Sequence, residues 1–490
     1  MRFSKQNSER GNVLLCVLCT ILVVSVIGGN VLLNCMTRYN TASSQVRSWK
    51  ESLDAAETGG DIAYAEVRKS ILNTTGTCIG TPATCPLNGW TYTGGVYSNS
   101  AITYGNDSLT TAAKVDLFYY DSNGNPWYRI RTSGTAPVLG FKRVGMDDRM
   151  GPNNRGDSLL RKIDFNYDHF VATYGPNGDG LNKALVPVSR PQVTRRVELI
   201  AAPITPFEAA IKTTSTFYGL GDAAMIDSYN SANGAYYFAA NSPNDPHYSD
   251  SRSGNVEIDS SVATIRGWVY GNVATNGGTI IRSQYITGTI DNNVPFTVPP
   301  FKMPTDFPVP QPNPNKVPGN SNVTITPQAN GTAQAPISYL FSSFTGNLTL
   351  KPYANTQTYI DIHVTSDITG TIDVTPNVTA RIYFDGNVNV KARDIVNESG
   401  IASNLQFYGI SPTDPSVSQS IAIGPPGNYA ATFYAPSADF SLTGNPDITG
   451  AIVCKTFYGN GNTTWHYDRK LDSVGDAVDY RVINYVEDTR

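Results

Sequence analysis

Histidine and the acidic residues are the side chains here that could carry metal or acid–base chemistry. The four histidines are His169, His247, His363 and His466. Metal-binding histidines usually recur within roughly three to five residues of another ligand, and these four are widely separated. The sequence therefore predicts no metal site.

Hydrolysis of a polysaccharide would need two carboxylates held a few ångströms apart. Asp439, Asp447 and Asp468, together with His466, are the candidates near the C-terminal end. Their spacing does not bring them together, and no phosphate-binding loop, nucleophile elbow or dinucleotide fingerprint accompanies them. We expect neither enzymatic activity nor a cofactor.

Two of the six cysteines form a second chemical pattern. Cys78 and Cys85 flank a short loop that contains glycine and proline. In an exported protein such a pair is expected to close the loop with a disulfide; two free thiols are the alternative. Cys16 and Cys19 lie inside an apolar stretch and are interpreted as small membrane-buried residues.

Length and charge limit the class of protein. A chain of 490 residues exceeds one typical core, so several domains are expected. The net charge is -4 and no basic stripe is present, which argues against nucleic acid as a partner. Short β-branched and aromatic runs separated by Gly, Asn, Asp and Pro predict a mainly β fold.

The N-terminal segment predicts a membrane span. Val13 to Leu33 is an apolar run of 21 residues, close to the roughly 20 that a helix needs to cross a bilayer. Arg2, Lys5 and Arg10 precede it, which places the N-terminus in the cytoplasm and the bulk of the chain outside. A cleaved signal peptide is the alternative, but no Ala-x-Ala-type site follows.

The same helix is predicted to continue as an amphipathic segment to residue 72. Apolar or small residues recur there at steps of three and four, which places one stripe along a helix. The stripe, predicted to pack on a folded domain, consists of Val46, Trp49, Leu53, Ala56, Gly60, Ala63 and Val67.

Two further regions follow the helical segment at 1–72. Region 73–203 contains a hairpin pattern, in which two alternating strands flank the turn at 121–125, and is predicted to form a small antiparallel sheet. From 204 to 490, short strands separated by Gly or Asn recur every 10 to 25 residues. That spacing favours a parallel β-helix, and a β-sandwich is the alternative.

Two features mark the third region. The pentapeptide Ile286-Thr-Gly-Thr-Ile290 recurs at 368–372 and, with one change, at 448–452, either as equivalent points in a solenoid or by chance. Nine prolines between 295 and 318 exclude a central strand and predict an extended surface or interdomain crossing.

Three blocks of the N-terminal segment resemble a known family. Glu9-Arg-Gly-Asn-Val-Leu-Leu15, Ser25-Val-Ile-Gly28 and Leu53-Asp-Ala-Ala-Glu-Thr-Gly59 resemble, in order and spacing, the start of PilX-type type IV pilus assembly proteins, which are minor-pilin-like. The stretch from Phe433 to Asp468 resembles the β-helix-like modules that follow such starts in bacterial envelope proteins. The resemblance implies a pilin-like α+β domain followed by a right-handed parallel β-helix-like domain.

The sequence departs from the prepilin pattern at the processing site. If cleavage follows Gly11, the mature chain begins at Asn12 rather than at an aromatic residue or Met. Its fifth residue is Cys16, where prepilins carry the Glu that pairs with a neighbouring subunit. Processing between Gly11 and Asn12 and bulk incorporation into a filament therefore both stay open.

The resemblance implies a membrane-anchored structural component of a type IV pilus or a related secretion filament. Its partners would be the lipid bilayer and other pilin-like subunits or pilus assembly proteins. The expected location is the bacterial cytoplasmic membrane, with one span and the bulk periplasmic or extracellular. A stand-alone surface adhesin that binds glycans is the main alternative, and a β-helix enzyme acting on polysaccharides is the third.

Overall fold

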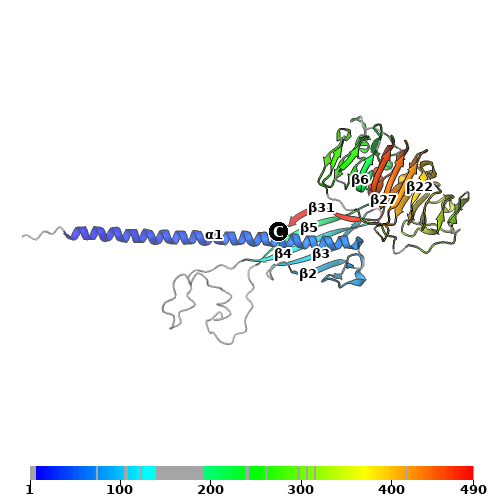
Figure 1. The fold of residues 1–490 in the computed structure, drawn as a ribbon. Coiled ribbons are helices and arrows are strands. Elements are labelled where there is room, and N and C mark those ends of the chain that lie inside the picture. Colours follow the sequence, from blue (N-terminus) through cyan, green and yellow to red (C-terminus); the bar gives the residue numbers. More distant parts are fainter. Residues whose placement is uncertain are drawn as a thin grey trace, which may run out of the picture. The chain divides into compact units, whose positions relative to one another are not determined.

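The fold consists of one long helix and many short strands (Figure 1). The computed structural model describes residues 7–72, 76–103, 109–121, 124–138, 192–219, 221–234, 236–237, 242–259, 262–281, 283–294, 298–304, 307–313, 316–319, 321–414 and 416–488. The chain forms two compact units, each described in turn below. The expectation of a mainly β chain with one long N-terminal helix is confirmed.

The first unit contains helix α1, Asn7–Leu72, and a six-stranded sheet. No proline interrupts residues 7–72, so every backbone amide in that stretch can take part in the helix. The sheet strands are β1 Thr91–Thr93, β2 Val96–Thr103, β3 Thr110–Tyr120, β4 Pro126–Pro137, β5 Gln192–Ile204 and β31 Asp479–Asp488.

The strand order in this sheet is β1-β2-β3-β4-β5-β31. The pairs β1/β2, β2/β3 and β4/β5 are antiparallel. The predicted hairpin corresponds to β3 and β4, and its turn is closed by the Asp121 carboxylate, which accepts from the backbone N–H of Asn125 at 2.8 Å. The last strand, β31, joins the sheet from the far end of the chain, which the sequence did not indicate.

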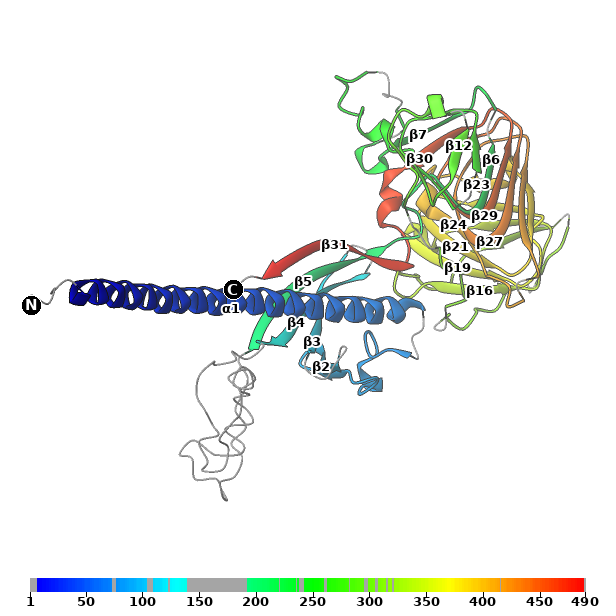
Figure 2. The ribbon, with the colours of Figure 1, turned by 60° about the vertical axis from the view of Figure 1, so that its left-hand side comes forward.

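The second unit is built from short strands in several sheets (Figure 2). The strands before the proline-rich segment are β6 Ile211–Gly219, β7 Met225–Tyr229, β8 Val256–Ile258, β9 Val262–Ile265, β10 Trp268–Val269, β11 Val273–Thr275, β12 Thr279–Ile281 and β13 Ile290–Asp291. Those after it, up to the middle of the unit, are β14 Lys316–Val317, β15 Asn322–Ile325, β16 Ile337–Phe341, β17 Ser343–Phe344, β18 Asn347–Leu350, β19 Thr358–Val364, β20 Thr371–Val374, β21 Val378–Phe384 and β22 Val388–Lys391. The remaining ones are β23 Ile395–Asn397, β24 Leu405–Gly409, β25 Gln419–Gly424, β26 Tyr429–Ala430, β27 Thr432–Thr443, β28 Asp447–Thr449, β29 Ile452–Asn460 and β30 Thr464–Asp468.

The largest sheet of this unit has its strands in the order β13-β11-β8-β6-β29-β27-β24-β21-β19-β16, and neighbouring strands in this order pair in parallel. From β16 to β29 the order follows the chain. The next neighbour is β6, where Ile211 pairs with Ile452. The early strands of this unit therefore continue a stack that the late strands began.

A five-stranded sheet, β10-β7-β30-β28-β26, repeats this order on a second side, because β30 pairs in parallel with β7. Strands β15-β18-β20-β23 form a further parallel sheet. The space between the sheets is filled by apolar side chains in rows, including Phe407 and Phe433, whose ring centroids lie 4.6 Å apart. Burial of such rows is the main stabilising term of a parallel stack.

The repeated pentapeptide marks corners between sheets. Ile448 lies in β28 of the five-stranded sheet, and Ile452 begins β29 of the largest sheet. A Cβ atom on the intervening Gly450 would lie 1.9 Å from the carbonyl oxygen of Ala431 in the preceding row, and one on Gly370 would lie 1.9 Å from that of Gly346. Only glycine permits this approach, so the motif reflects corner geometry rather than chance.

The proline-rich segment crosses the stack from one end to the other. Residues 298–304 and 307–313 form no strand, whereas Lys316–Val317, near the end of the segment, form the two-residue strand β14. Tyr434 donates to the Pro299 carbonyl at 3.0 Å, Phe301 exchanges hydrogen bonds with Ser411, and the Gln311 N–H donates to Ser338 at 2.7 Å. The segment thus passes β27, β24 and β16 in turn, and connects β13 at one end of the stack to β14 and β16 near the other.

Candidate functional site

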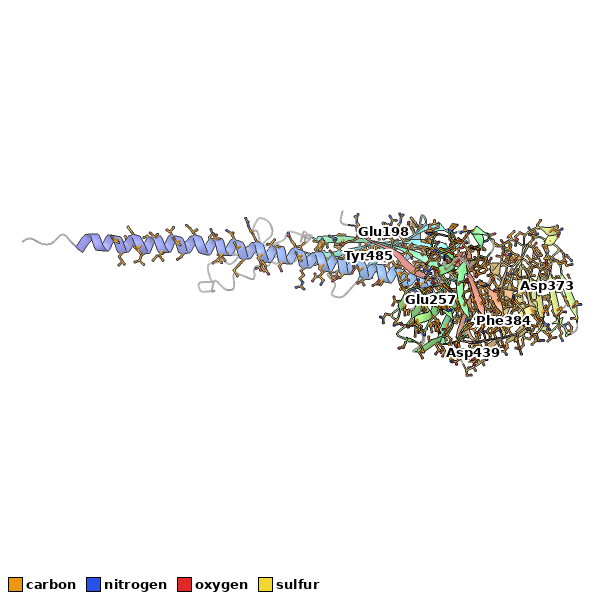
Figure 3. All side chains as sticks on the ribbon, turned by 90° about the horizontal axis from the view of Figure 1, so that it is seen from above. Glu198, Glu257, Asp373, Phe384, Asp439 and Tyr485 are labelled. Atoms are coloured by element: carbon orange, nitrogen blue, oxygen red, sulfur yellow. A yellow bond between two sulfur atoms is a disulfide. The ribbon has the colours of Figure 1, made fainter. Side chains whose placement is uncertain are left out.

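Within the part of the chain that the structure describes, the apolar half of α1 is exposed and makes no contact with the folded units (Figure 3). The exposed large side chains are Val13, Leu14, Leu15, Val17, Leu18, Ile21, Leu22, Val23, Val24, Val26, Ile27, Val31, Leu32, Leu33 and Met36. Among the described residues, this is the one helix long and apolar enough to cross a membrane, and its most apolar window is wholly unburied. An apolar surface this long marks a membrane or protein contact.

Two threonines in or next to this half bond back to the helix itself. Thr20 donates to the carbonyl of Cys16 at 2.7 Å, and Thr37 donates to that of Leu33 at 2.8 Å. Such bonds to the preceding turn let hydroxyl groups enter hydrocarbon without an unpaired donor. Cys16 and Cys19 are free and exposed. Arg2 and Lys5, on which the predicted orientation depends, lie outside the described residues.

The second half of α1 packs on the sheet through small residues. The buried positions on this face are Ser48, Ser52, Ala55, Ala56, Gly59, Gly60, Ala63, Glu66 and Val67. Thr132 of β4 donates to the Ala56 carbonyl at 2.7 Å, and Ser48 donates to that of Pro137 at 2.9 Å. A Cβ on Gly134 would lie 2.1 Å from the Ser52 carbonyl oxygen, so helix and strand are in backbone contact.

We call this contact between the buried face of α1 and the sheet the helix seam. Part of the predicted stripe does not lie in it. Ala56, Gly60, Ala63 and Val67 are buried as predicted, and Leu53 is half-buried. The prediction is wrong at Val46 and incomplete at Trp49, which are 66% and 47% exposed. Their places in the seam are taken by Ser48 and Ser52, because close packing selects for small size and the prediction had followed hydrophobicity.

Trp49 still contacts the sheet, through the guanidinium group of Arg195 in β5. The Arg195 guanidinium carbon lies 4.1 Å from the centroid of its ring. Arg195 also forms an ion pair with Glu487 of β31. Residues from α1, β5 and the C-terminal strand therefore meet at one buried arginine, which connects the helix to both strands.

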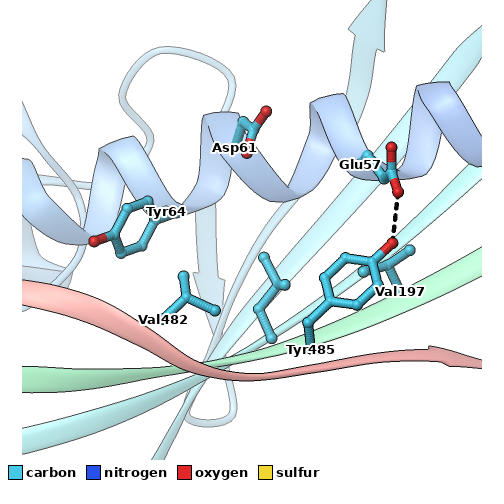
Figure 4. Close-up of a pocket in the computed structure, with 7 residues that line it drawn as sticks. Glu57, Asp61, Tyr64, Val197, Val482 and Tyr485 are labelled. Atoms are coloured by element: carbon cyan, nitrogen blue, oxygen red, sulfur yellow. Dashed lines mark hydrogen bonds between the residues drawn. The ribbon is translucent and has the colours of Figure 1, made fainter. Parts of the chain in front are cut away.

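A cavity of 310 Å³ lies beside the helix seam (Figure 4). Its lining residues are Glu57, Asp61, Tyr64, Val197, Leu199, Val482 and Tyr485. Tyr485 donates to the Glu57 carboxylate at 2.6 Å. Burial, together with the hydrogen bond and the charge of Glu57, raises the pKa of Tyr485 to about 12, so the phenol stays protonated at neutral pH. The hydrogen bond holds β31 against α1. The lining of this cavity does not place a nucleophile beside a general base.

A disulfide joins Cys78 and Cys85 and closes the loop after α1. Cys78 is fully buried, and the loop packs through Ile79. Thr81 and Thr84 both bond backbone carbonyls within the same loop, at 2.7 and 2.8 Å. The loop is therefore a compact structural element of the first unit.

Of the three candidate acids, Asp447 is the one that bonds His466. His466 of β30 bonds Asp447 of β28 through Nε2 at 2.9 Å. Its Nδ1 lies 2.6 Å from Asp227 of β7, and Tyr236 donates to the other oxygen of Asp227 at 2.7 Å. Asp227 and Tyr236 had no signal in the sequence, because only the pairing of β30 with β7 makes them neighbours of His466.

The other two predicted acids lie elsewhere in the second unit. Asp439 accepts from Ser418 and Thr456 at 2.8 and 2.7 Å, and so ties rows of the largest sheet together. Asp468 is fully buried and accepts from the backbone of Ser231 at 2.9 Å. His169 lies outside the described residues, and no group of three or more metal-ligating side chains is found in the part of the chain that the structure describes.

Electrostatics favour a charged histidine in this cluster. Burial by itself lowers the pKa of His466, but the hydrogen bonds and charges of Asp227 and Asp447 outweigh it and raise the pKa to about 9. Burial raises the pKa of Asp227, and its bonds to His466 and Tyr236 oppose that shift. Because both ring nitrogens are bonded to carboxylates, neither is available as a general base. His466 instead links β30 to β28 and β7, an arrangement that we call the tie at His466.

Comparisons with known proteins give the following similarities. A family described as a domain of unknown function, DUF7305, matches residues 354–474, which lie within the second unit and make up less than half of the chain. None of the curated proteins matches the chain. The crystal structure of the competence-associated pilin ComZ from Thermus thermophilus aligns at 10% identity and a TM-score of 0.19, over 89% of this chain and 97% of that one.

Proposed function

We propose that this protein is a membrane-anchored structural component of a type IV pilus or a related filament or secretion system. One observation carries the proposal: a single uninterrupted helix is bare and apolar over residues 13–36 and buried against a sheet from Ser48 onward. An anchor alone needs no rigid continuation into a folded domain. A subunit that moves from the bilayer into a helical bundle needs both halves.

The apolar half has the length for this role. The 21 residues from Val13 to Leu33 rise about 31 Å as a helix, which is about the thickness of the hydrocarbon core. In the bilayer these side chains would contact lipid, and in a filament they would contact the helices of neighbouring subunits. The N-terminus would be cytoplasmic and both folded units would lie outside the cytoplasmic membrane.

We propose a minor-pilin-like role rather than that of the bulk subunit. Position 16 is a cysteine, so the acidic side chain that pairs with a neighbouring N-terminus is missing. We also propose that the second unit is a right-handed parallel β-helix. Its support is the recurrence of parallel strands at steps of 17 to 26 residues from β16 to β29. We propose no enzymatic activity.

Two aspartates in the apolar half test the anchor. Each charged residue near the centre of a span costs about 2.5–3.5 kcal/mol of insertion free energy. Val17→Asp combined with Leu22→Asp should therefore move the protein from the membrane to the soluble fraction. Val309→Asp, at an 86% exposed position of the second unit, is the matched control and should leave it in the membrane. Retention of the double variant would contradict the proposal.

Filament association is tested separately on native cells. Filaments are sheared off, and both fractions are probed by mass spectrometry that also determines the N-terminus of the protein. Recovery with filaments, starting at Asn12, supports a processed minor subunit. Recovery only in the membrane fraction with residues 1–11 intact contradicts the filament role and favours the adhesin alternative.

A further inference from the structure

We propose that the outer face of the sheet β10-β7-β30-β28-β26 in the second unit binds a hydroxyl-rich oligosaccharide. The inference does not depend on membrane anchoring or on filament assembly. It rests on the way parallel pairing lines up aromatic and acidic side chains that are far apart in the sequence.

The strand register places these side chains in one outward column. Asp447 pairs with Thr464, Thr464 with Met225, and Met225 with Trp268. The bridge between Val269 and Ile286 continues the column to Tyr285. The residues that follow in the strands, Ile448, Trp465, Ile226 and Val269, are fully buried, so alternation fixes the column as outward-facing.

The aromatic end of the column offers ring surface to solvent. Trp268 is 42% exposed, although it contacts Tyr285 edge-on at 5.4 Å and lies nearly parallel to Tyr270 at 6.1 Å. These neighbours hold the indole in one orientation. Aromatic rings of this kind stack against the C–H faces of sugar rings, and preorganisation lowers the entropic cost of binding.

The polar end offers hydrogen-bond acceptors. Asp447 gives one oxygen to His466, yet its side chain is 55% exposed. Tyr236 covers His466, with ring centroids 3.7 Å apart, so the charged pair behind Asp447 is shielded. A carboxylate held in this way accepts hydrogen bonds from sugar hydroxyl groups without having to be ordered first.

The dimensions suit a short linear chain. Asp447 and Trp268 are three strand steps apart, or about 14 Å at roughly 4.8 Å per step. Thr464 and Met225 lie between them, and both side chains are half-buried, so they project little from the sheet surface. A stable protein interface needs about 800 Å² per partner. A strip with one exposed aromatic end and one exposed acidic end fits a narrow, polar ligand better than a protein surface.

The test uses the full chain in lipid nanodiscs, since maltoside detergents carry sugars of their own. Cellohexaose, chitohexaose and maltohexaose are the probes, and binding is followed by calorimetry and tryptophan fluorescence. We expect at least one probe to bind. Trp268→Ala should weaken it about tenfold or more, equal to about 1.4 kcal/mol, and Trp268→Phe should restore part of the affinity. Asp447→Asn should also weaken it.

Tyr458→Ala is the matched control, because Tyr458 is a 46% exposed aromatic residue on another sheet of the same unit. It should leave affinity unchanged, and thermal melting should show that all variants remain folded. Failure of all three probes to bind overturns the proposal, as does equal affinity in the Trp268→Ala protein. Self-association of the wild type that Trp268→Ala abolishes would instead assign the face to a second copy of the chain.

Discussion

Gly134 of β4 is the most sensitive position of the helix seam. A methyl group there would lie 2.1 Å from the carbonyl oxygen of Ser52 and 2.3 Å from the amide nitrogen of Ala56. These two atoms are hydrogen-bonding partners within α1, because they stand four residues apart. Gly134→Ala therefore pushes a side chain into a helical backbone hydrogen bond, where no rotamer change can relieve the clash.

The size of the effect follows from the distances. Ordinary contact begins at 3.4 Å, so α1 must move away by more than 1 Å. The hydrogen bond from Thr132 to the Ala56 carbonyl, now 2.7 Å, would then stretch beyond useful range. Overpacking costs about 1–3 kcal/mol and the lost bond about 1 kcal/mol. We expect local stability to fall by about 2–4 kcal/mol.

Hydrogen exchange measured by mass spectrometry on the full chain in micelles reports this change. Amides in residues 51–67 of α1 and in β4 should exchange roughly 30-fold faster or more, since 1.4 kcal/mol is a factor of ten. Gly424→Ala is the control, because nothing lies within 4 Å of a Cβ there. Exchange within a factor of two of wild type in the Gly134→Ala protein would refute close backbone packing at the seam.

Two further predictions concern the tie at His466 and the disulfide. The folded pKa of His466, about 9, exceeds the ordinary 6.5, so its contribution of about 3 kcal/mol is complete below pH 6.5 and is lost as pH rises through 9. Urea unfolding across that range should show that the free energy of unfolding falls as pH rises. The His466→Gln protein should lose this slope and the His363→Gln protein should keep it. An unchanged slope in the His466→Gln protein would exclude the tie. Replacing Cys78 and Cys85 by serine should lower stability by about 2.5 kcal/mol, the chain entropy of the loop they close, and a thermal melt of the first unit unaffected by the change would contradict this.

The seam shows why hydrophobic periodicity located the helix but only part of its contact face. The three- and four-residue spacing correctly marked Ala56, Gly60, Ala63 and Val67. It also selected Val46 and Trp49, because they are the apolar residues nearest the stripe. At close range, volume decides which residues face the sheet.

The tie at His466 shows what sequence spacing cannot supply. Asp447 and His466 were recognised as chemically capable residues, yet Asp227, the second partner of His466, lies 239 residues before it in the chain. It becomes a neighbour because β6 and β7, which pair on one side with β8 and β10, pair on the other side with β29 and β30. Nothing local encodes that pairing.

Local sequence thus determined the elements of this protein, because each depends on interactions within a few residues: the apolar run sets a membrane-length helix, β-branched runs set short strands, and prolines keep residues 298–304 and 307–313 out of the strands. Tertiary structure alone decided which strands are neighbours. The proline-rich segment returns the chain to the opposite end of the stack, so late strands meet early ones, and Trp268, Asp227, His466 and Asp447 come to lie on one sheet. That outcome depends on burying the apolar rows of the whole stack at once, an energy summed over residues far apart in the chain.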